Sequence, residues 1–128
     1  MKKDLLLQIA DLVDTISDRE FNMSYWRYGM GCGTVGCAIG HAIVKEMIPG
    51  LVLSEPVPQP VPTNLYPAEP GSPVPNDIFL LVANKLGLKK NYAIFLFDPE
   101  QFEIDKEGDR ITQAQVSSRI RAFVAQRS

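Results

Sequence analysis

Histidine and cysteine are scarce in this 128-residue sequence, and their scarcity limits the chemistry that the chain can perform. His41 is the only histidine, so catalysis by an imidazole would have to use this one residue. Cys32 and Cys37 are too few and too close together to form the disulfide framework of a secreted domain. We therefore expect reduced thiols and a cytoplasmic protein.

Long apolar segments and an excess of positive charge are also lacking. No stretch reaches the roughly 18 apolar residues that a membrane-spanning helix requires. The 13 Lys and Arg residues stand against 15 Asp and Glu residues, which gives a net charge of −2. Proteins that bind nucleic acid or an anionic membrane usually carry a basic surface. The sequence therefore predicts neither a nucleic-acid partner nor a membrane partner.

Proline, by contrast, is concentrated in one segment of the chain. Most of the 10 prolines lie between Pro56 and Pro75, and residues 51–75 contain no Lys or Arg. Prolines at every second position over residues 56–62 exclude a helix and a central strand and favour an extended polyproline conformation. We interpret residues 49–75 as an irregular proline-rich insert that either covers the core or contacts a partner.

Helical periodicity on both sides of this insert predicts the fold. Apolar residues repeat with a helical period in four segments, namely 4–17, 34–47, 76–86 and the chain from Thr112 onward. Residues 89–97 fit either a strand or a short helix, and we favour the helix. Thr34 is the expected N-cap of the second helix, and Thr112 begins a capping box with Gln115. We therefore predict a mainly α protein of about five short helices. They form one compact domain over residues 1–128, with a long proline-rich loop between the N- and C-terminal helical halves.

The reactive side chains gather in residues 32–41, and three interpretations of them compete. Cys32 could be a nucleophile beside a helix N-terminus, with His41 or a distant carboxylate assisting. Alternatively, Cys32, Cys37 and His41 could bind zinc, although a fourth ligand would have to be a carboxylate or water. The third interpretation, which we favour, treats both cysteines as small buried apolar residues. His41 then lies at the edge of the core and donates a hydrogen bond to a backbone carbonyl. This interpretation predicts neither a metal nor a cofactor.

A ligand site is the other interpretation of this region. Residues 21–34 are rich in aromatic residues and glycine and are expected to form a structured loop before the second helix. Glycines before a helix can bind an anion, but a preceding strand and a phosphate-binding lysine are absent here. Aromatic side chains in the loop could still stack on a small ligand, or they could be a lid over the helix. The candidate binding residues are Tyr25, Trp26, Cys32, Gly33, Thr34, Cys37 and His41.

Several motifs together resemble those of a known group of proteins. They are Trp26, the segment CGTVGCAIGHA over residues 32–42, the LGL junction over residues 86–88 with a later LF, and Thr112 with Gln115-Val116. This combination resembles a family of small bacterial and phage proteins to which no activity is assigned. The resemblance spans most of the chain outside the proline-rich insert, and it implies a compact helical domain.

The sequence favours a non-enzymatic binding module of bacterial or phage origin, such as a phage-encoded inhibitor or a small-ligand binder. The contact surface would be loop 21–34 with the N-terminus of helix 34–47, and the partner would be a protein or a small ligand. The alternative is a small thiol-dependent or metal-assisted enzyme centred on Cys32, Cys37 and His41. The oligomeric state stays open. A surplus of apolar residues suggests a dimer face, and these residues are Phe79, Phe95, Phe97 and Phe102.

Overall fold

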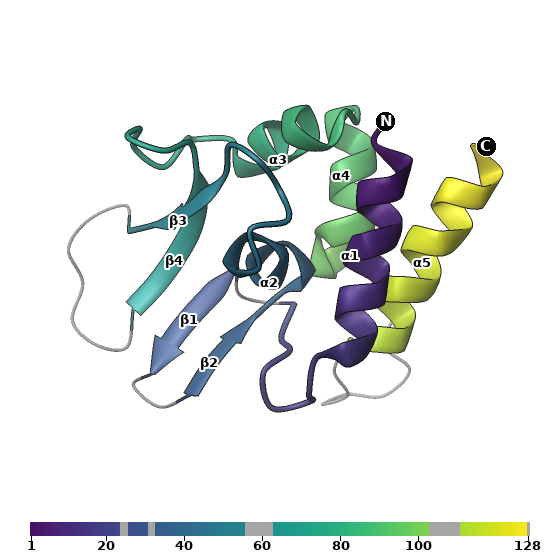
Figure 1. Cartoon of the computed structure of the whole chain (residues 1–128), viewed down its shortest axis with the longest axis horizontal. Coiled ribbons are helices and arrows are strands. Elements are labelled where there is room, and N and C mark those ends of the chain that lie inside the picture. The colour runs from purple at the N-terminus through teal and green to yellow at the C-terminus, as the bar shows by residue number, and fades with distance from the viewer. Residues whose placement is uncertain (24–25, 31–32, 56–62, 103–110, 128) are drawn as a thin grey trace.

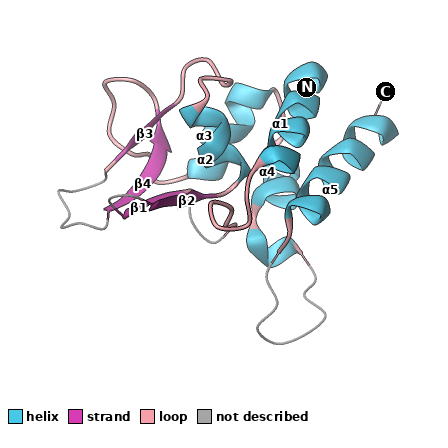
Figure 2. Cartoon of the chain, turned by 60° about the horizontal axis from the view of Figure 1, so that its bottom comes forward, coloured by secondary structure: helices cyan, strands magenta, loops and turns pink. Residues whose placement is uncertain are grey.

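The computed structural model confirms a mainly helical protein with its helices gathered in one compact domain (Figure 1). It describes residues 1–23, 26–30, 33–55, 63–102 and 111–127. Five α-helices and a small four-stranded sheet lie within these residues. The sheet lies at one end of the molecule and most of the helices at the other (Figure 2).

The first and last helices lie side by side and form one wall of the core (Figure 1). Helix α1 (Lys3–Thr15) and helix α5 (Gln113–Gln126) each bury one apolar face. The capping box predicted for α5 is confirmed, because Thr112 Oγ1 accepts from the Gln115 N–H while Gln115 Oε1 accepts from the Thr112 N–H. The apolar residues of these two faces are buried as their spacing predicts: Leu6, Ile9, Val13, Val116, Ile120, Phe123 and Val124.

Helices α3 (Ile78–Leu86) and α4 (Lys90–Phe97) are joined by a short turn, and they correspond to the helices expected over 76–86 and 89–97. Asp77 caps α3 by accepting from the Leu80 N–H at 3.1 Å, and Gly87 ends it in the left-handed conformation at φ 68°. Asp98 ends α4 and starts the short 3-10 helix η1 (Pro99–Gln101).

The second predicted helix begins later than expected. Helix α2 spans Ala38–Val44, with Cys37 rather than Thr34 as its N-cap. The prediction failed because the preceding residues pair as a strand: β2 (Gly33–Gly36) forms an antiparallel ladder with β1 (Arg27–Met30). The expected loop 21–34 is therefore, in its second half, a pair of strands. Its glycines had obscured the alternating period by which a strand is recognised.

The proline-rich insert also contains strands, so residues 49–75 are not irregular throughout. Strand β3 (Val52–Ser54) and strand β4 (Thr63–Ala68) pair with each other, and the sheet order is β2-β1-β4-β3. The polyproline segment predicted for residues 56–62 lies outside the described residues. Strand β4 pairs with β1 only over residues 63–65. Pro67 lies beyond that overlap, so its missing N–H costs the β1 ladder no hydrogen bond.

The four phenylalanines suggested as a dimer face do not lie together on the surface. Phe97 and Phe102 are 1% and 7% exposed and belong to the core. Phe95 is exposed, but the Arg119 guanidinium covers its ring. That part of the dimer argument was wrong. None of the described helices is long and apolar enough to cross a membrane.

Candidate functional site

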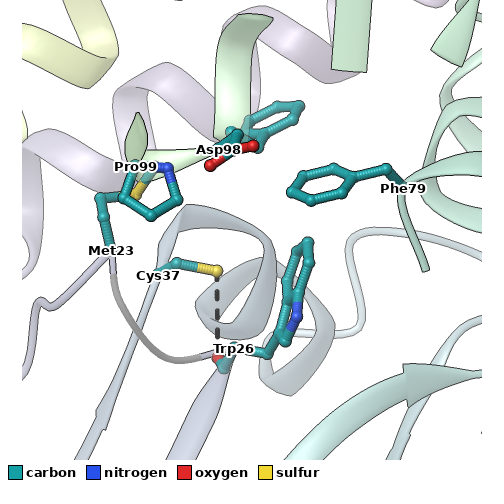
Figure 3. A pocket seen from close by; sticks show the side chains of 7 residues that line it. Met23, Trp26, Cys37, Phe79, Asp98 and Pro99 are labelled. Atoms are coloured by element: carbon teal, nitrogen blue, oxygen red, sulfur yellow. Dashed lines mark hydrogen bonds between the residues drawn. The ribbon is translucent and has the colours of Figure 1, made fainter. Parts of the chain in front are cut away.

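A small pocket lies where the helices meet the end of the sheet (Figure 3). Its volume is about 140 Å³. This is close to the ~150 Å³ of a cavity known to accept benzene, so the pocket can hold a group of about that size. Seven residues from four separate parts of the chain line it: Met23, Trp26, Cys37, Phe79, Phe97, Asp98 and Pro99.

Two aromatic rings form a wall of the pocket. Trp26, just before β1, and Phe79, in the first turn of α3, have ring centroids 5.1 Å apart and planes inclined at 57°. Both side chains are half-buried and pack against the core. Figure 3 shows the Phe79 ring and the Trp26 indole at one side of the pocket. A tilted pair of this kind presents both edges and faces of its π systems to a neighbouring group.

Asp98 supplies the charge of the pocket. It is half-buried at the end of α4, and Figure 3 shows its carboxylate across the pocket from the Trp26 backbone. Oδ1 accepts from the Glu100 N–H at 3.0 Å and so caps η1. Oδ2 has no hydrogen-bond partner in the described part of the chain, and it can therefore accept from a ligand. The lining residues that the structure describes include no Lys, Arg or His.

Cys37 places a thiol on the wall of the pocket, but not a reactive one. The residue is 2% exposed, and burial raises the pKa of its thiol to about 11. The Gly40 N–H donates to Sγ at 3.5 Å, and Sγ–H points to the Trp26 carbonyl oxygen at 4.0 Å. A thiol with a pKa this high is almost wholly protonated at neutral pH. It is therefore a poor nucleophile.

His41 is at the edge of the core, as our favoured interpretation predicts. It is 6% exposed on α2, and its Nε2 lies 2.7 Å from the Glu20 carbonyl oxygen. Because a carbonyl oxygen can only accept, Nε2 carries the proton in this contact. The same segment pairs with the end of β2, since the Gly36 N–H donates to Glu20 O at 3.0 Å. His41 therefore helps to attach residues 20–22 to α2, and it does not line the pocket.

The structure brings only two of the seven predicted site residues to the pocket, namely Trp26 and Cys37. Gly33 and Thr34 belong to β2, where their backbones pair with Met30 and Gly29. Tyr25 and Cys32 lie outside the described residues, so the nucleophile predicted at Cys32 is not placed. Within the described ranges, no three His, Cys, Asp or Glu side chains gather as a metal site would require.

The expected ligand cradle at the second helix also needs correction. Gly33 and Thr34 both pair in β2, so Gly33 does not lie at the N-terminus of a helix. The true N-cap is Cys37, whose sulfur already accepts from the Gly40 N–H. The expected aromatic contribution comes from Trp26, whose ring packs against Phe79 of α3 and which lines the pocket together with Cys37, the N-cap of α2.

Sequence reasoning missed Phe79 and Asp98 as site residues. Phe79 carried no distinguishing signal, because it lies on the same helical face as Val82 and Leu86, where an apolar residue is expected to belong to the core. Asp98 carried no signal in the sequence beyond its position at the predicted end of a helix. Nothing in the sequence pattern shows that the end of α4 reaches the start of β1.

Comparisons of the chain with protein-family models, with curated proteins and with solved structures find no match. The resemblance to small bacterial and phage proteins therefore stays a prediction. The pocket is the feature of the described structure from which a function can be inferred.

Proposed function

We propose that the protein is a non-enzymatic binding module whose contact site is the pocket between Trp26, Phe79 and Asp98. The observation that supports it is the composition of the lining: aromatic and apolar walls with one carboxylate, that of Asp98, whose Oδ2 can accept a hydrogen bond. A concave apolar site with a few polar groups is typical of ligand and partner recognition. The ligand would be a small molecule or a side chain of a protein partner.

The chemistry of the pocket gives an enzyme less support. The thiol that lines it is held protonated by burial, and the imidazole of His41 is engaged with a backbone carbonyl outside the pocket. A general acid–base pair or an activated nucleophile needs two such groups within hydrogen-bond reach of each other. Of the described groups, Cys37 and His41 serve the packing around α2.

The predicted cytoplasmic location and bacterial or phage origin are part of this proposal. A buried, free Cys37 is compatible with a reducing compartment. Whether the partner is a host protein, a phage protein or a small ligand, the proposal requires it to bind at the same pocket.

A fragment screen tests this function. Ligand-observed NMR with a panel of single-ring and short-chain compounds of positive, neutral and negative charge should find binders in the millimolar range. Phe79→Ala should abolish their binding, because it removes half of the aromatic wall. Leu80→Ala is the matched control: Leu80 is the next residue of α3, is 45% exposed and does not line the pocket. A panel without any binder, or binding that survives Phe79→Ala, would refute the function.

A further inference from the structure

We propose that the pocket selects an alkylammonium group, either in a free amine or at the end of a lysine side chain. This inference rests on the proposed binding function and specifies its ligand. It combines three features of one site: the aromatic pair, the carboxylate, and a lining whose described residues include no Lys, Arg or His.

The aromatic pair favours a cation. The faces of indole and benzene rings carry partial negative charge and attract an ammonium group within about 6 Å of the ring centroid. Tryptophan is the strongest of the aromatic side chains in this respect. Trp26 and Phe79 stand tilted to each other at 57°, so a group in the pocket can meet two rings at once. A neutral apolar group would gain only the free energy of burying its own surface in the pocket.

The polar atoms around the pocket favour the same ligand. Asp98 Oδ2 can accept a hydrogen bond and carries negative charge, and the Trp26 carbonyl oxygen lies across the pocket, where it receives a weak contact from the Cys37 thiol. The other lining residues are Met23, Phe97 and Pro99, whose side chains are uncharged. An anionic ligand would therefore meet a carboxylate without a compensating cation, which is a repulsive arrangement.

The size of the pocket limits the ligand. A volume of about 140 Å³ accommodates a four-carbon chain with an amino group, or a methylated ammonium group. It is too small for a nucleotide or a sugar chain. The ligand therefore enters by one end, with the ammonium group between the rings and Asp98.

The test compares three probes that share a four-carbon chain: n-butylammonium, n-butanol and butanoate. Binding to the full chain is measured by NMR titration at low salt. We expect n-butylammonium to bind about tenfold more tightly than n-butanol, as expected for one charge-assisted hydrogen bond with a cation–π contact. We expect butanoate to bind most weakly. Equal affinity for the ammonium and the alcohol would overturn the inference.

A pair of variants locates the charge that matters. Asp98→Asn removes the charge but keeps an oxygen that can cap η1, so the fold is preserved. It should reduce the affinity for n-butylammonium to that for n-butanol. Glu100→Gln removes an equal charge from an exposed position two residues away and should change the affinity by less than about twofold. Equal losses in both variants would show a general charge effect and refute a role for Asp98.

The same titrations separate the two proposals and the two ligand sources. If n-butanol binds and n-butylammonium does not, the ammonium inference fails while the binding function stands. If none of the three probes binds, the ammonium inference fails, and the fragment panel decides whether the binding function stands. Nα-acetyl-lysine methylamide distinguishes a side chain from a free amine: binding at least as tight as that of n-butylammonium supports a lysine of a partner, and weaker binding supports a free amine.

Discussion

At the scale of single residues, burial determines what Cys37 does in this molecule. Its sulfur serves as the N-cap of α2, where it accepts from the Gly40 N–H, and as part of the pocket wall. Loss of the thiol proton would place a charge at a site that is 2% exposed. Burial is therefore the largest cause of its raised pKa.

The raised pKa of Cys37 predicts a loss of stability at alkaline pH. The thiol titrates near its ordinary pKa of 9.0 in the unfolded chain and near 11 in the folded protein. Its contribution is fully present below pH 9 and is lost as the pH rises toward 11, because the unfolded state then releases the proton first. We expect this one group to lower the free energy of unfolding by up to about 2–3 kcal/mol over that interval.

The measurement is urea denaturation of the wild type and of Cys37→Ser between pH 7 and pH 11. Serine keeps an oxygen that can cap α2, and it does not titrate in this range. The wild type should lose more stability than the variant above pH 9. Parallel curves would contradict the assignment of a raised pKa to Cys37.

Single residues also show how far sequence reasoning reaches into the site. The bonding of His41 to a backbone carbonyl followed from its place on an apolar helix, and the contact with Glu20 O confirms it. Phe79 and Asp98 could not be joined to Trp26 in the same way. Their proximity depends on how α3 and α4 pack against the sheet, and that packing leaves no periodic signal in the sequence.

At the scale of elements, the C-terminal ends of α2 and α3 adopt the same backbone conformation with different residues. Helix α2 ends in a Schellman-type pattern, in which the Glu46 N–H donates to Ile43 O and the Met47 N–H donates to Ala42 O. Glu46 adopts the left-handed conformation, at φ 57°. Helix α3 ends with Gly87 in the same conformation, at φ 68°. Only glycine takes this conformation without a steric cost.

Two opposite substitutions at these helix ends should therefore have opposite effects. Glu46→Gly relieves the left-handed strain and should raise the free energy of unfolding by about 0.5–1 kcal/mol, after the extra chain entropy of glycine is subtracted. Gly87→Ala introduces the strain and should lower it by about 1–2 kcal/mol. A Cβ at residue 87 would also lie 3.3 Å from Met1 Cα and Met1 N.

Chemical denaturation of both variants beside the wild type checks this pair. A Glu46→Gly variant less stable than the wild type would mean that the glutamate side chain stabilises the turn by a contact greater than the strain. A Gly87→Ala variant of unchanged stability would contradict the steric account of the end of α3.

The elements also differ in how well the sequence predicts them. Helices α1, α3 and α5 were predicted because each has an apolar face with a helical period, and both ends of α3 and the N-terminus of α5 carry clear caps. The β1–β2 pair was missed because its glycines, at 29, 33 and 36, leave few side chains to alternate. Strands β3 and β4 were missed because the prolines around them outweighed the strand-forming residues Val52, Leu65 and Tyr66.

At the scale of the whole molecule, the pocket exists only because separate parts of the chain meet. Trp26 comes from the start of the sheet, Phe79 from α3, and Asp98 from the end of α4, which also packs against α5. The proline-rich insert, with β3 and β4, links the two helical halves and completes the sheet that leads to Trp26. Ligand binding at this pocket therefore depends on how these parts of the domain pack against one another.

The central claim is that this pocket binds a small cationic group, and Trp26 provides the most direct measurement. It is the only tryptophan of the chain, so its indole N–H gives a single cross-peak in a ¹⁵N-correlated NMR spectrum. During titration with n-butylammonium, the account predicts a saturable shift of this cross-peak in the wild type and none in Phe79→Ala. An indole cross-peak that stays in place in the wild type up to saturating ligand would contradict it.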